Sequence, residues 1–388
     1  MNDKAVGQAL PPANPHSTAA VGRRKRLPHL ADEFRARRQK LADALAARGA
    51  GALLVSAAPN IRYLSGFTGD NAALLVLPGQ AVLFTDPRFA IQAAQQVSCR
   101  VKICKGPLME GVAAALGKLG AVRIGYEAAR MTCAAFQALE SRLPMKASLD
   151  PFPAMVEELR MIKSAAEIEL IRRSVEINSR AFELAIRRVR PGMTERDLAA
   201  EIEYRMRRLG AERPSFETIV AAGRRSALPH AEPTAARLRH GDMVVVDMGA
   251  FCDGYASDMT RMLFLGTPGA RVKRIYRAVL EAQLAGIDRV RAGVAAFQVD
   301  SAARRVLRAH GLDRAFVHST GHGLGLEIHE PPRLGKRDKT ILQPGMAVTI
   351  EPGVYLEDFG GIRIEDTVEV TEAGCKILTP TPKELRVI

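Results

Sequence analysis

The sequence predicts an α/β domain followed by an α+β domain that consists of two related halves. Two observations lead to this fold class. In the first part of the chain, short apolar runs alternate with helical patterns, as they do in α/β domains. In the second part, two pairs of strand-like segments flank turns rich in Gly, and helical patterns precede both pairs. The repeated order of helices and hairpins suggests two structurally related halves.

Length and composition are those of a globular protein with a substantial core. The 388 residues are 47% hydrophobic and 25% charged, which is ordinary for such a protein. No run approaches the roughly 18 apolar residues of a membrane span, so we expect no membrane partner. The net charge of +14 raises nucleic-acid binding as a hypothesis. We expect no nucleic-acid partner, because the basic residues are spread over helices without interleaved aromatic residues.

The first domain is expected to follow a short leader. Residues 1–29 are rich in Pro, Ala and basic residues and lack the apolar core of a signal peptide, so we expect them to be disordered. An amphipathic helical pattern covers residues 31–48. Apolar runs follow, with a turn at Asn60 and a helix near residues 89–96. These patterns predict an α/β domain over residues 30–155.

The second domain is expected over residues 156–388. Ser164 and Glu167 form a capping box that opens a helix, and Thr194 with Asp197 opens the next. The chain has an odd number of cysteines without the clustering of a metal site, and it is too large to need disulfides. A reducing cytoplasm fits these cysteines, which are Cys99, Cys104, Cys133, Cys252 and Cys375.

Two aspartates lie in the first predicted hairpin. The strand-like segments are MVVVDMGA and YASDMTRMLFL, on either side of a Cys-Asp-Gly turn. If the turn is centred between Cys252 and Asp253, pairing places Asp247 directly opposite Asp258. Facing carboxylates about 5 Å apart repel each other unless a cation lies between them. The first hairpin therefore predicts a cation site.

The second predicted hairpin repeats this arrangement with two glutamates. Its strand-like segments are MAVTIE and IRIEDTVEV, and they place Glu351 and Glu365 at facing strand ends. His322 joins the set from the stretch HSTGHGLGLEIHEPP, where small residues let the backbone approach a site closely. Four carboxylates and one imidazole are too hard a set for a structural zinc site. Two ions about 3.5 to 4 Å apart could share a water and lower its pKa, so a hydrolase is the leading interpretation.

The second domain resembles the catalytic domain of the Xaa-Pro peptidases, the aminopeptidase P and prolidase family with the pita-bread fold. The resemblance rests on the segments FETIVAAGRRSALPHAEPT, GDMVVVDMGAFCDGYASDMTR, HSTGHGLGLEIHEPP and VTIEPGVYLEDFGGIRIED. In the first domain, NIRYLSGFTGDN resembles the amino-terminal domain of creatinase and prolidase. The resemblance implies a pita-bread catalytic domain with two pseudo-symmetric halves, preceded by a non-catalytic domain, in a homodimer.

In that family two Asp, one His and two Glu hold two divalent ions, which here match Asp247, Asp258, His322, Glu351 and Glu365. The resemblance implies that Asp247 binds one ion through both oxygens and that Asp258 and Glu365 bridge the two. His322 and Glu351 would complete the other coordination sphere, and Glu351 would also take a proton from the shared water. We expect Mn²⁺, with Co²⁺, Fe²⁺ or Zn²⁺ as alternatives.

Three further histidines match family positions around the substrate. His230 and His329 are implied to stabilise the tetrahedral intermediate and to hold the peptide, and His318 is implied to take part in catalysis. Hydrogen-bonding loop residues are the alternative for all three. Arg363 is expected to share a strand face with Glu365 and to orient that ligand. Arg333 could capture a substrate carboxylate with its fork of donors, or be an ordinary surface arginine.

The expected function is a metal-dependent exopeptidase that cleaves the bond between an N-terminal residue and proline. The substrates would be longer peptides, as for aminopeptidase P, or dipeptides alone, as for prolidase, and Arg333 favours dipeptides. Methionine aminopeptidases are an alternative, but they typically lack an amino-terminal domain like residues 30–150. Creatinase and binding proteins that have lost ligands use the same fold without metal, and the complete set of ligands argues against them.

Overall fold

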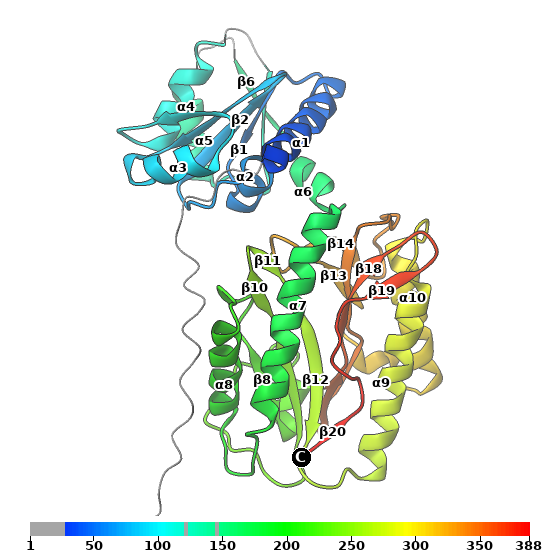
Figure 1. The fold of residues 1–388 in the computed structure, drawn as a ribbon. Coiled ribbons are helices and arrows are strands. Elements are labelled where there is room, and N and C mark those ends of the chain that lie inside the picture. The colour runs from blue at the N-terminus through cyan, green and yellow to red at the C-terminus, as the bar shows by residue number, and fades with distance from the viewer. Residues whose placement is uncertain (1–27, 120–122, 144–146) are drawn as a thin grey trace, which may run out of the picture.

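The structure is a computed structural model that describes residues 28–119, 123–143 and 147–388. The expected leader therefore lies almost entirely outside the described residues. An N-terminal domain with one six-stranded sheet precedes a larger domain of helices and mainly antiparallel strands (Figure 1). Within the described residues, no helix is both long enough and apolar enough to cross a membrane.

The N-terminal sheet has the strand order β4-β3-β2-β1-β5-β6. Its strands are β1 (Ala52–Val55), β2 (Ala72–Leu77), β3 (Gln80–Thr85), β4 (Arg100–Ile103), β5 (Arg123–Tyr126) and β6 (Ser148–Pro151). The helices are α1 (Pro28–Ala47), α2 (Ala58–Ser65), α3 (Ala90–Gln96), α4 (Leu108–Leu116) and α5 (Cys133–Glu140), with a 3-10 turn η1 (Pro87–Phe89).

Side chains along β1 alternate between the two faces of the sheet, so the N-terminal core has two layers. Leu53 and Val55 belong to the cluster that includes Leu41 of α1. Leu54 points to the opposite face, where it joins Leu116 of α4. Because helices cover both faces of a mixed sheet, this domain is α/β, as predicted.

The turn predicted at Asn60 is wrong. Asn60 lies inside α2, and its buried amide group donates to Glu127 (2.6 Å) and Glu157 (2.9 Å). These two hydrogen bonds outweigh the weak preference of Asn against helix interiors.

Both halves of the second domain begin with two helices and continue with strands. The first half has α7 (Ala165–Ile186), α8 (Glu195–Arg208), β7 (Arg213–Pro214), β8 (Ile219–Ala222), η2 (Gly223–Ala227), β9 (Met243–Met248), β10 (Ala250–Cys252), β11 (Tyr255–Ala256) and β12 (Met259–Phe264). The second half has α9 (Ala270–Arg289), α10 (Ala296–Ala309), η3 (Asp313–Ala315), β13 (Gly321–Gly323), β14 (Glu330–Leu334), β15 (Ala347–Ile350), β16 (Gly353–Leu356), β17 (Gly360–Arg363), β18 (Asp366–Val370) and β19 (Cys375–Ile377). The short helix α6 (Met155–Arg160) precedes the first half, and β20 (Arg386–Val387) pairs with β12.

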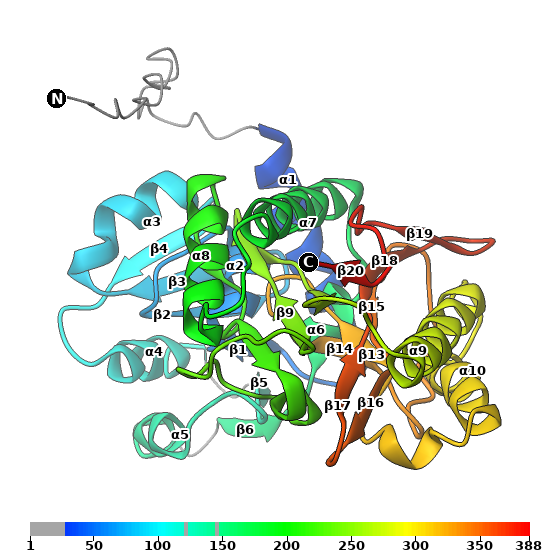
Figure 2. The ribbon, with the colours of Figure 1, turned by 90° about the horizontal axis from the view of Figure 1, so that it is seen from below.

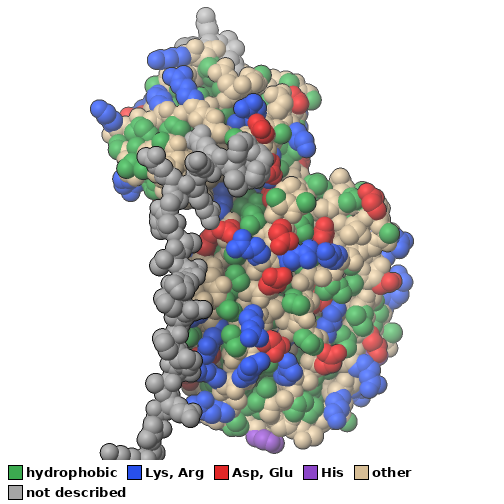
Figure 3. All heavy atoms as spheres, viewed as in Figure 1, with side chains coloured by type: hydrophobic (Ala, Val, Ile, Leu, Met, Phe, Trp, Pro, Cys, Tyr) green, Lys and Arg blue, Asp and Glu red, His purple; other side chains and the backbone are tan. Residues whose placement is uncertain are grey.

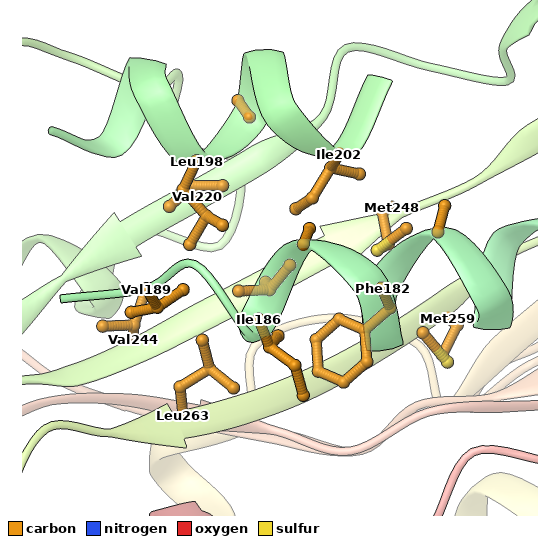
Figure 4. Packing of buried hydrophobic residues seen from close by; sticks show 14 of the residues in the cluster. Phe182, Ile186, Val189, Leu198, Ile202, Val220, Val244, Met248, Met259 and Leu263 are labelled. Atoms are coloured by element: carbon orange, nitrogen blue, oxygen red, sulfur yellow. The ribbon is translucent and has the colours of Figure 1, made fainter. Parts of the chain in front are cut away.

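The helices of each half pack on the outer side of the strands. Seen from below, α7 and α8 lie on one side of the strands and α9 and α10 on the other (Figure 2). In the first half, Phe182 of α7 and Ile202 of α8 join Val244 of β9 and Leu263 of β12 in one cluster (Figure 4). On the face in Figure 3, acidic and basic side chains of the second domain are intermingled.

Both predicted capping boxes are present. The Ser164 and Glu167 side chains each accept from the other residue's backbone N–H, at 3.3 and 3.0 Å. Thr194 and Asp197 do the same at the start of α8, at 3.1 and 2.9 Å. Each box satisfies two N–H groups that a helix terminus leaves without partners.

The register predicted for the second hairpin is correct. Ile350 pairs with Asp366 in one ladder, and Gly353 pairs with Arg363 in the next. Glu351 directly follows Ile350 and Glu365 directly precedes Asp366, so the two glutamates face each other between the two ladders.

The register predicted for the first hairpin is wrong by two residues. Asp247 pairs with Thr260 rather than with Asp258. The turn is centred between Asp253 and Gly254, whose φ angles are 49° and 79°. Two positive φ angles suit an Asp-Gly pair, which is a preferred two-residue hairpin turn. Because side chains alternate with a period of two, this shift leaves both aspartates on the expected face.

Candidate active site

A pocket of about 780 Å³ contains every residue that the sequence predicted for the site. These residues come from both halves of the second domain, and they include the candidate metal ligands, the three histidines and two arginines. They are His230, Asp247, Asp258, His318, His322, His329, Arg333, Glu351, Arg363 and Glu365.

The four carboxylates occupy matching places in the two halves. Asp247 lies near the end of β9, and Glu351 directly follows the corresponding strand β15. Asp258 directly precedes β12, and Glu365 directly precedes β18. Each half thus contributes two carboxylates from the region where its long strand pair, β9–β12 or β15–β18, meets the shorter strand pair that extends it.

Backbone hydrogen bonds hold two of the candidate ligands in place. The Glu365 N–H donates to the Thr260 carbonyl oxygen (3.2 Å), which ties the second half to β12 of the first. The Glu351 N–H donates to the Thr320 carbonyl oxygen (2.7 Å), just before the strand that carries His322. These two hydrogen bonds therefore fix the backbone at Glu365 and at Glu351.

His322 lies among the carboxylates. Its Nε2 is 3.5 Å from Asp258 Oδ2 and 3.3 Å from Glu351 Oε1. One ligand atom each from Asp258, His322 and Glu365 lie within 4.8 Å of one another. This spacing is suitable for side chains that share a cation.

Three buried carboxylate oxygens in this cluster have no hydrogen-bond partner among the residues that the structure describes. They belong to Asp247 (Oδ1), Asp258 (Oδ1) and Glu365 (Oε1). Leaving buried polar atoms unsatisfied is costly, and buried charges in proteins are usually paired or coordinate metals. The oxygen-rich donor set with one imidazole therefore fits divalent metal ions.

The pKa shifts within the cluster are also consistent with a site for divalent metal ions. Burial, together with the Asp247 charge, raises the pKa of Asp258 to about 7 against the opposing effect of His322. Burial and the neighbouring carboxylates also raise the pKa of Glu365. Burial would lower the pKa of His322, but Asp258 and Glu351 raise it well above its ordinary value. A bound cation would displace these protons, so metal binding and proton release are coupled.

Arg363 contacts two ligands in different ways. Its guanidinium donates to Asp247 Oδ2 (2.6 Å), a contact that the sequence did not predict. It also donates to the Thr260 hydroxyl (3.0 Å), which in turn donates to Glu365 Oε2 (2.7 Å). The expected link from Arg363 to Glu365 thus runs through Thr260. Thr260 was missed because a hydroxyl within a strand pattern carries no signal of its own.

Tyr355 is a second residue that the sequence interpretation missed. Its hydroxyl accepts from Arg363 (2.6 Å) and lies 2.9 Å from His318 Nε2. Burial raises the pKa of Tyr355 to about 12 and lowers the pKa of His318. With Nδ1 of His318 at 2.8 Å from the Ser319 carbonyl oxygen, a neutral ring donates there and accepts from Tyr355 through Nε2. Tyr355 was missed because its role depends on His318 and Arg363, whose positions relative to it the sequence pattern does not show.

The remaining predicted residues lie at the open side of the pocket. His230 and His329 are exposed, and the His329 ring centroid is 4.4 Å from that of His322. Arg333 is also exposed, and it pairs with His322 across the β13–β14 ladder. Its Nε donates to the Ser319 hydroxyl (3.2 Å). The pocket therefore combines an acidic cluster with imidazole and guanidinium groups at its rim.

Comparisons with known proteins match both domains. A model of metallopeptidase family M24 matches residues 169–372, and a model of the creatinase/prolidase N-terminal domain matches residues 37–162. A Xaa-Pro dipeptidase of Pyrococcus horikoshii is 37% identical over 86% of this chain and 94% of its own length.

Solved structures agree along nearly the whole chain. A Xaa-Pro dipeptidase from Bacillus anthracis has a TM-score of 0.89 and 38% identity, over 92% of this chain and all of its own. An X-Pro aminopeptidase from Thermotoga maritima has a TM-score of 0.82 and 37% identity, over 88% of this chain and 98% of its own. The second domain has the expected pita-bread fold, and the chain belongs to metallopeptidase family M24, with a creatinase/prolidase N-terminal domain.

Proposed function

We propose that this protein is a metal-dependent exopeptidase that hydrolyses the bond between an N-terminal residue and proline. The observation that carries the proposal is the pocket itself, where five side chains suited to metal binding lie beside three histidines and Arg333. Relatives named for Xaa-Pro dipeptidase and X-Pro aminopeptidase activity support the substrate class. The tertiary amide of proline lacks a donor and has a fixed ring, so a site that recognises the ring by shape can specialise.

The cofactor we propose is a pair of divalent ions, with Mn²⁺ the first choice. Asp247, Asp258, His322, Glu351 and Glu365 would hold them. When bound, such ions supply Lewis acidity toward the peptide carbonyl and lower the pKa of water. The carboxylate oxygens of the cluster that lack a partner within the described segments support this assignment.

The surrounding residues would move protons and orient the peptide. Glu351 has its pKa lowered to about 2, because His322 outweighs the effect of burial, so it is ionised and able to accept a proton from water. His318 is held in one orientation by Tyr355 and Ser319. His230 and His329 are free to contact the peptide at the pocket rim, where they would stabilise negative charge on the carbonyl oxygen.

Arg333 would bind the carboxylate of the proline residue in a dipeptide substrate. Its fork of donors suits a carboxylate, and it lies opposite His322 on the neighbouring strand. A dipeptide could then reach the acidic cluster with its scissile bond while its carboxylate meets Arg333. Longer peptides would lose this contact.

We also propose the domain division and cellular setting expected from the sequence. The division places residues 30–155 in the N-terminal domain and 156–388 in the catalytic domain, and the ranges that the two family models match support it. Within the described part of the chain, Cys104, Cys133, Cys252 and Cys375 form no disulfide, which supports a reducing cytoplasm. A homodimer is the proposed assembly.

The test compares an Xaa-Pro dipeptide with the matching Xaa-Pro-Yaa tripeptide on metal-stripped protein reconstituted with Mn²⁺. We expect the dipeptide to be cleaved faster, and Arg333→Met to raise the KM for the dipeptide more than for the tripeptide. Equal loss on both substrates would contradict the role of Arg333. Cleavage of neither substrate by the wild type would contradict the proposed function.

A further inference from the structure

We propose that Arg160 and Lys163 are positioning residues for the substrate side of the pocket, and that they act through Glu330. Arg160 ends α6 and Lys163 lies in the segment between α6 and α7, at the junction of the two domains. The functional part of this inference rests on the function proposed above, since Glu330 is flanked by His329 and begins the strand that carries Arg333.

The three side chains form a buried ion cluster. Arg160 donates to Glu330 Oε1, and Lys163 Nζ lies 3.3 Å from Glu330 Oε2. Each of the three side chains is only 2% exposed. Burying charges is costly, so their partners must be held in good geometry. Glu330 also lines the pocket.

Glu330 organises the loop that presents His329. Besides Arg160, its Oε1 accepts the backbone N–H of Glu327 (3.0 Å). The loop of residues 325–329 also packs directly on the ion cluster, because a Cβ added to Gly325 would lie 3.0 Å from both Glu330 oxygens and 3.1 Å from Lys163. The conformation of this loop therefore depends on where the carboxylate is held.

The same carboxylate fixes the start of β14. Glu330 is the first residue of that strand, which places Arg333 opposite His322. The four candidate carboxylate ligands come from other segments of the chain. Moving Glu330 would consequently shift His329 and Arg333 while leaving most of the metal-binding side chains in place.

The cluster also connects the pocket to the N-terminal domain. Arg160 donates to the Asn60 side-chain oxygen of α2 (2.6 Å), and Asn60 is itself bonded to Glu157 of α6. Arg130 of the N-terminal domain contacts Glu327 through both terminal nitrogens, at 2.9 and 2.8 Å. The orientation of the N-terminal domain is thereby linked to the loop that carries His329.

The experiment compares Lys163→Met with the matched control Arg37→Met in the full chain. Arg37 forms another buried contact between the domains, with Glu167 of α7 at 2.8 Å. None of its contacts with the described part of the chain involves residues 325–334. We expect faster hydrogen–deuterium exchange of residues 325–334 in Lys163→Met than in Arg37→Met. We also expect a KM for an Xaa-Pro dipeptide raised about tenfold, with bound Mn²⁺ unchanged.

Two further variants keep the test decisive. Lys163→Arg should restore the exchange rate and most of the KM, because it keeps a cation beside Glu330. If Lys163→Met fails to fold, Arg160→Gln, which removes the other cation beside Glu330, should show the same changes in exchange and KM. Unchanged exchange and KM in the folded variants, or equal effects in Arg37→Met, would overturn the positioning role. Hydrogen–deuterium exchange is measured without substrate. If the wild type did not cleave Xaa-Pro peptides, the proposed function would be wrong, but the exchange rates would still test the positioning role.

Discussion

At the scale of single residues, the pocket is defined by negative charge that is buried without enough donors. Arg363 satisfies one oxygen of Asp247, and Thr260 satisfies one oxygen of Glu365. The other oxygen of each, and Oδ1 of Asp258, have no partner among the described residues. These atoms mark where a cation would bring the most stabilisation, since its charge offsets both their repulsion and their desolvation.

Replacing Asp258 by Asn should separate the roles of charge and metal. The raised pKa of Asp258, about 7, means that ionising this carboxylate is unfavourable in the metal-free protein. Asp258→Asn should therefore raise the unfolding free energy of metal-free protein at pH 8 by about 4 kcal/mol. It should also abolish most of the stabilisation by Mn²⁺ and lower kcat/KM at least about a thousandfold.

Denaturant unfolding with and without chelator, together with metal analysis, measures both effects. The assignment of Asp258 as a ligand would be wrong if the variant bound Mn²⁺ as tightly as the wild type.

Tyr355→Phe should reduce turnover without removing metal. The hydroxyl connects Arg363 to His318, so its loss leaves the His318 ring without one of its two partners. We expect kcat to fall about tenfold or more, since positioned groups contribute through their orientation. Tyr276→Phe is the matched control, because the Tyr276 hydroxyl bonds the Lys383 carbonyl outside the pocket. Equal kcat values for the two variants would contradict a role for Tyr355.

At the scale of elements, the site depends on how closely neighbouring strands approach. β13 carries His322 and lies against β15, the strand before Glu351. This approach requires a glycine at position 321, because a Cβ there would overlap the Thr349 carbonyl oxygen. Close contact between these strands brings the imidazole to the carboxylates.

Gly321→Ala should therefore weaken metal binding. The added methyl group would push β13 away from β15 and move His322 from Glu351, and we expect at least about a tenfold loss in Mn²⁺ affinity. Gly374→Ala is the control, since a Cβ at that position would have no heavy atom within 4 Å among the described residues beyond its two chain neighbours. Calorimetric titration of both variants with Mn²⁺ would show the difference, and equal affinities would disprove the packing argument.

Local patterns explain why the sequence predicted some elements and not others. The capping boxes and the facing Glu351 and Glu365 follow from residues close in the chain or from one continuous hairpin. The first hairpin was placed two residues out, because the preference of Asp253 and Gly254 for a two-residue turn was not weighed.

The parts of the site that the sequence did not predict depend on distant partners. Arg363 and Asp247 are paired across 116 residues, and Arg160 and Glu330 across 170. Tyr355 and Thr260 contribute hydroxyl groups, whose roles become visible only when their neighbours are known. Hydrophobic periodicity and turn signals carry no information about such pairs.

At the scale of the whole molecule, metal binding and folding stability should be linked through protons. The pKa of Asp258 rises from 3.8 to about 7 on folding, and those of Glu365 and His322 rise as well. At these three groups the folded metal-free protein therefore holds more protons than the unfolded chain. For Asp258 the stability gained in this way is fully present below about pH 4 and is lost as the pH rises through about 7.

Metal-free protein should consequently lose stability between pH 5 and pH 8, by about 3 kcal/mol from Asp258 alone. Glu351 has a lowered pKa, and its opposite effect falls below this range, whereas the lowered pKa values of His318 and His329 oppose part of the loss within it. Protein loaded with Mn²⁺ should not show this loss, because the ions favour the ionised carboxylates. Denaturant unfolding at several pH values measures the slopes, and identical slopes with and without metal would contradict this linkage.

The most direct measurement of the central claim is hydrolysis of an Xaa-Pro dipeptide by metal-stripped protein titrated with Mn²⁺, alongside the matching Xaa-Ala dipeptide. We predict no cleavage before the metal is added, full activity at two ions per chain, and a preference for proline of about a hundredfold or more. Cleavage that persists in chelator, or no cleavage of the proline dipeptide after loading, would contradict a metal-dependent Xaa-Pro peptidase.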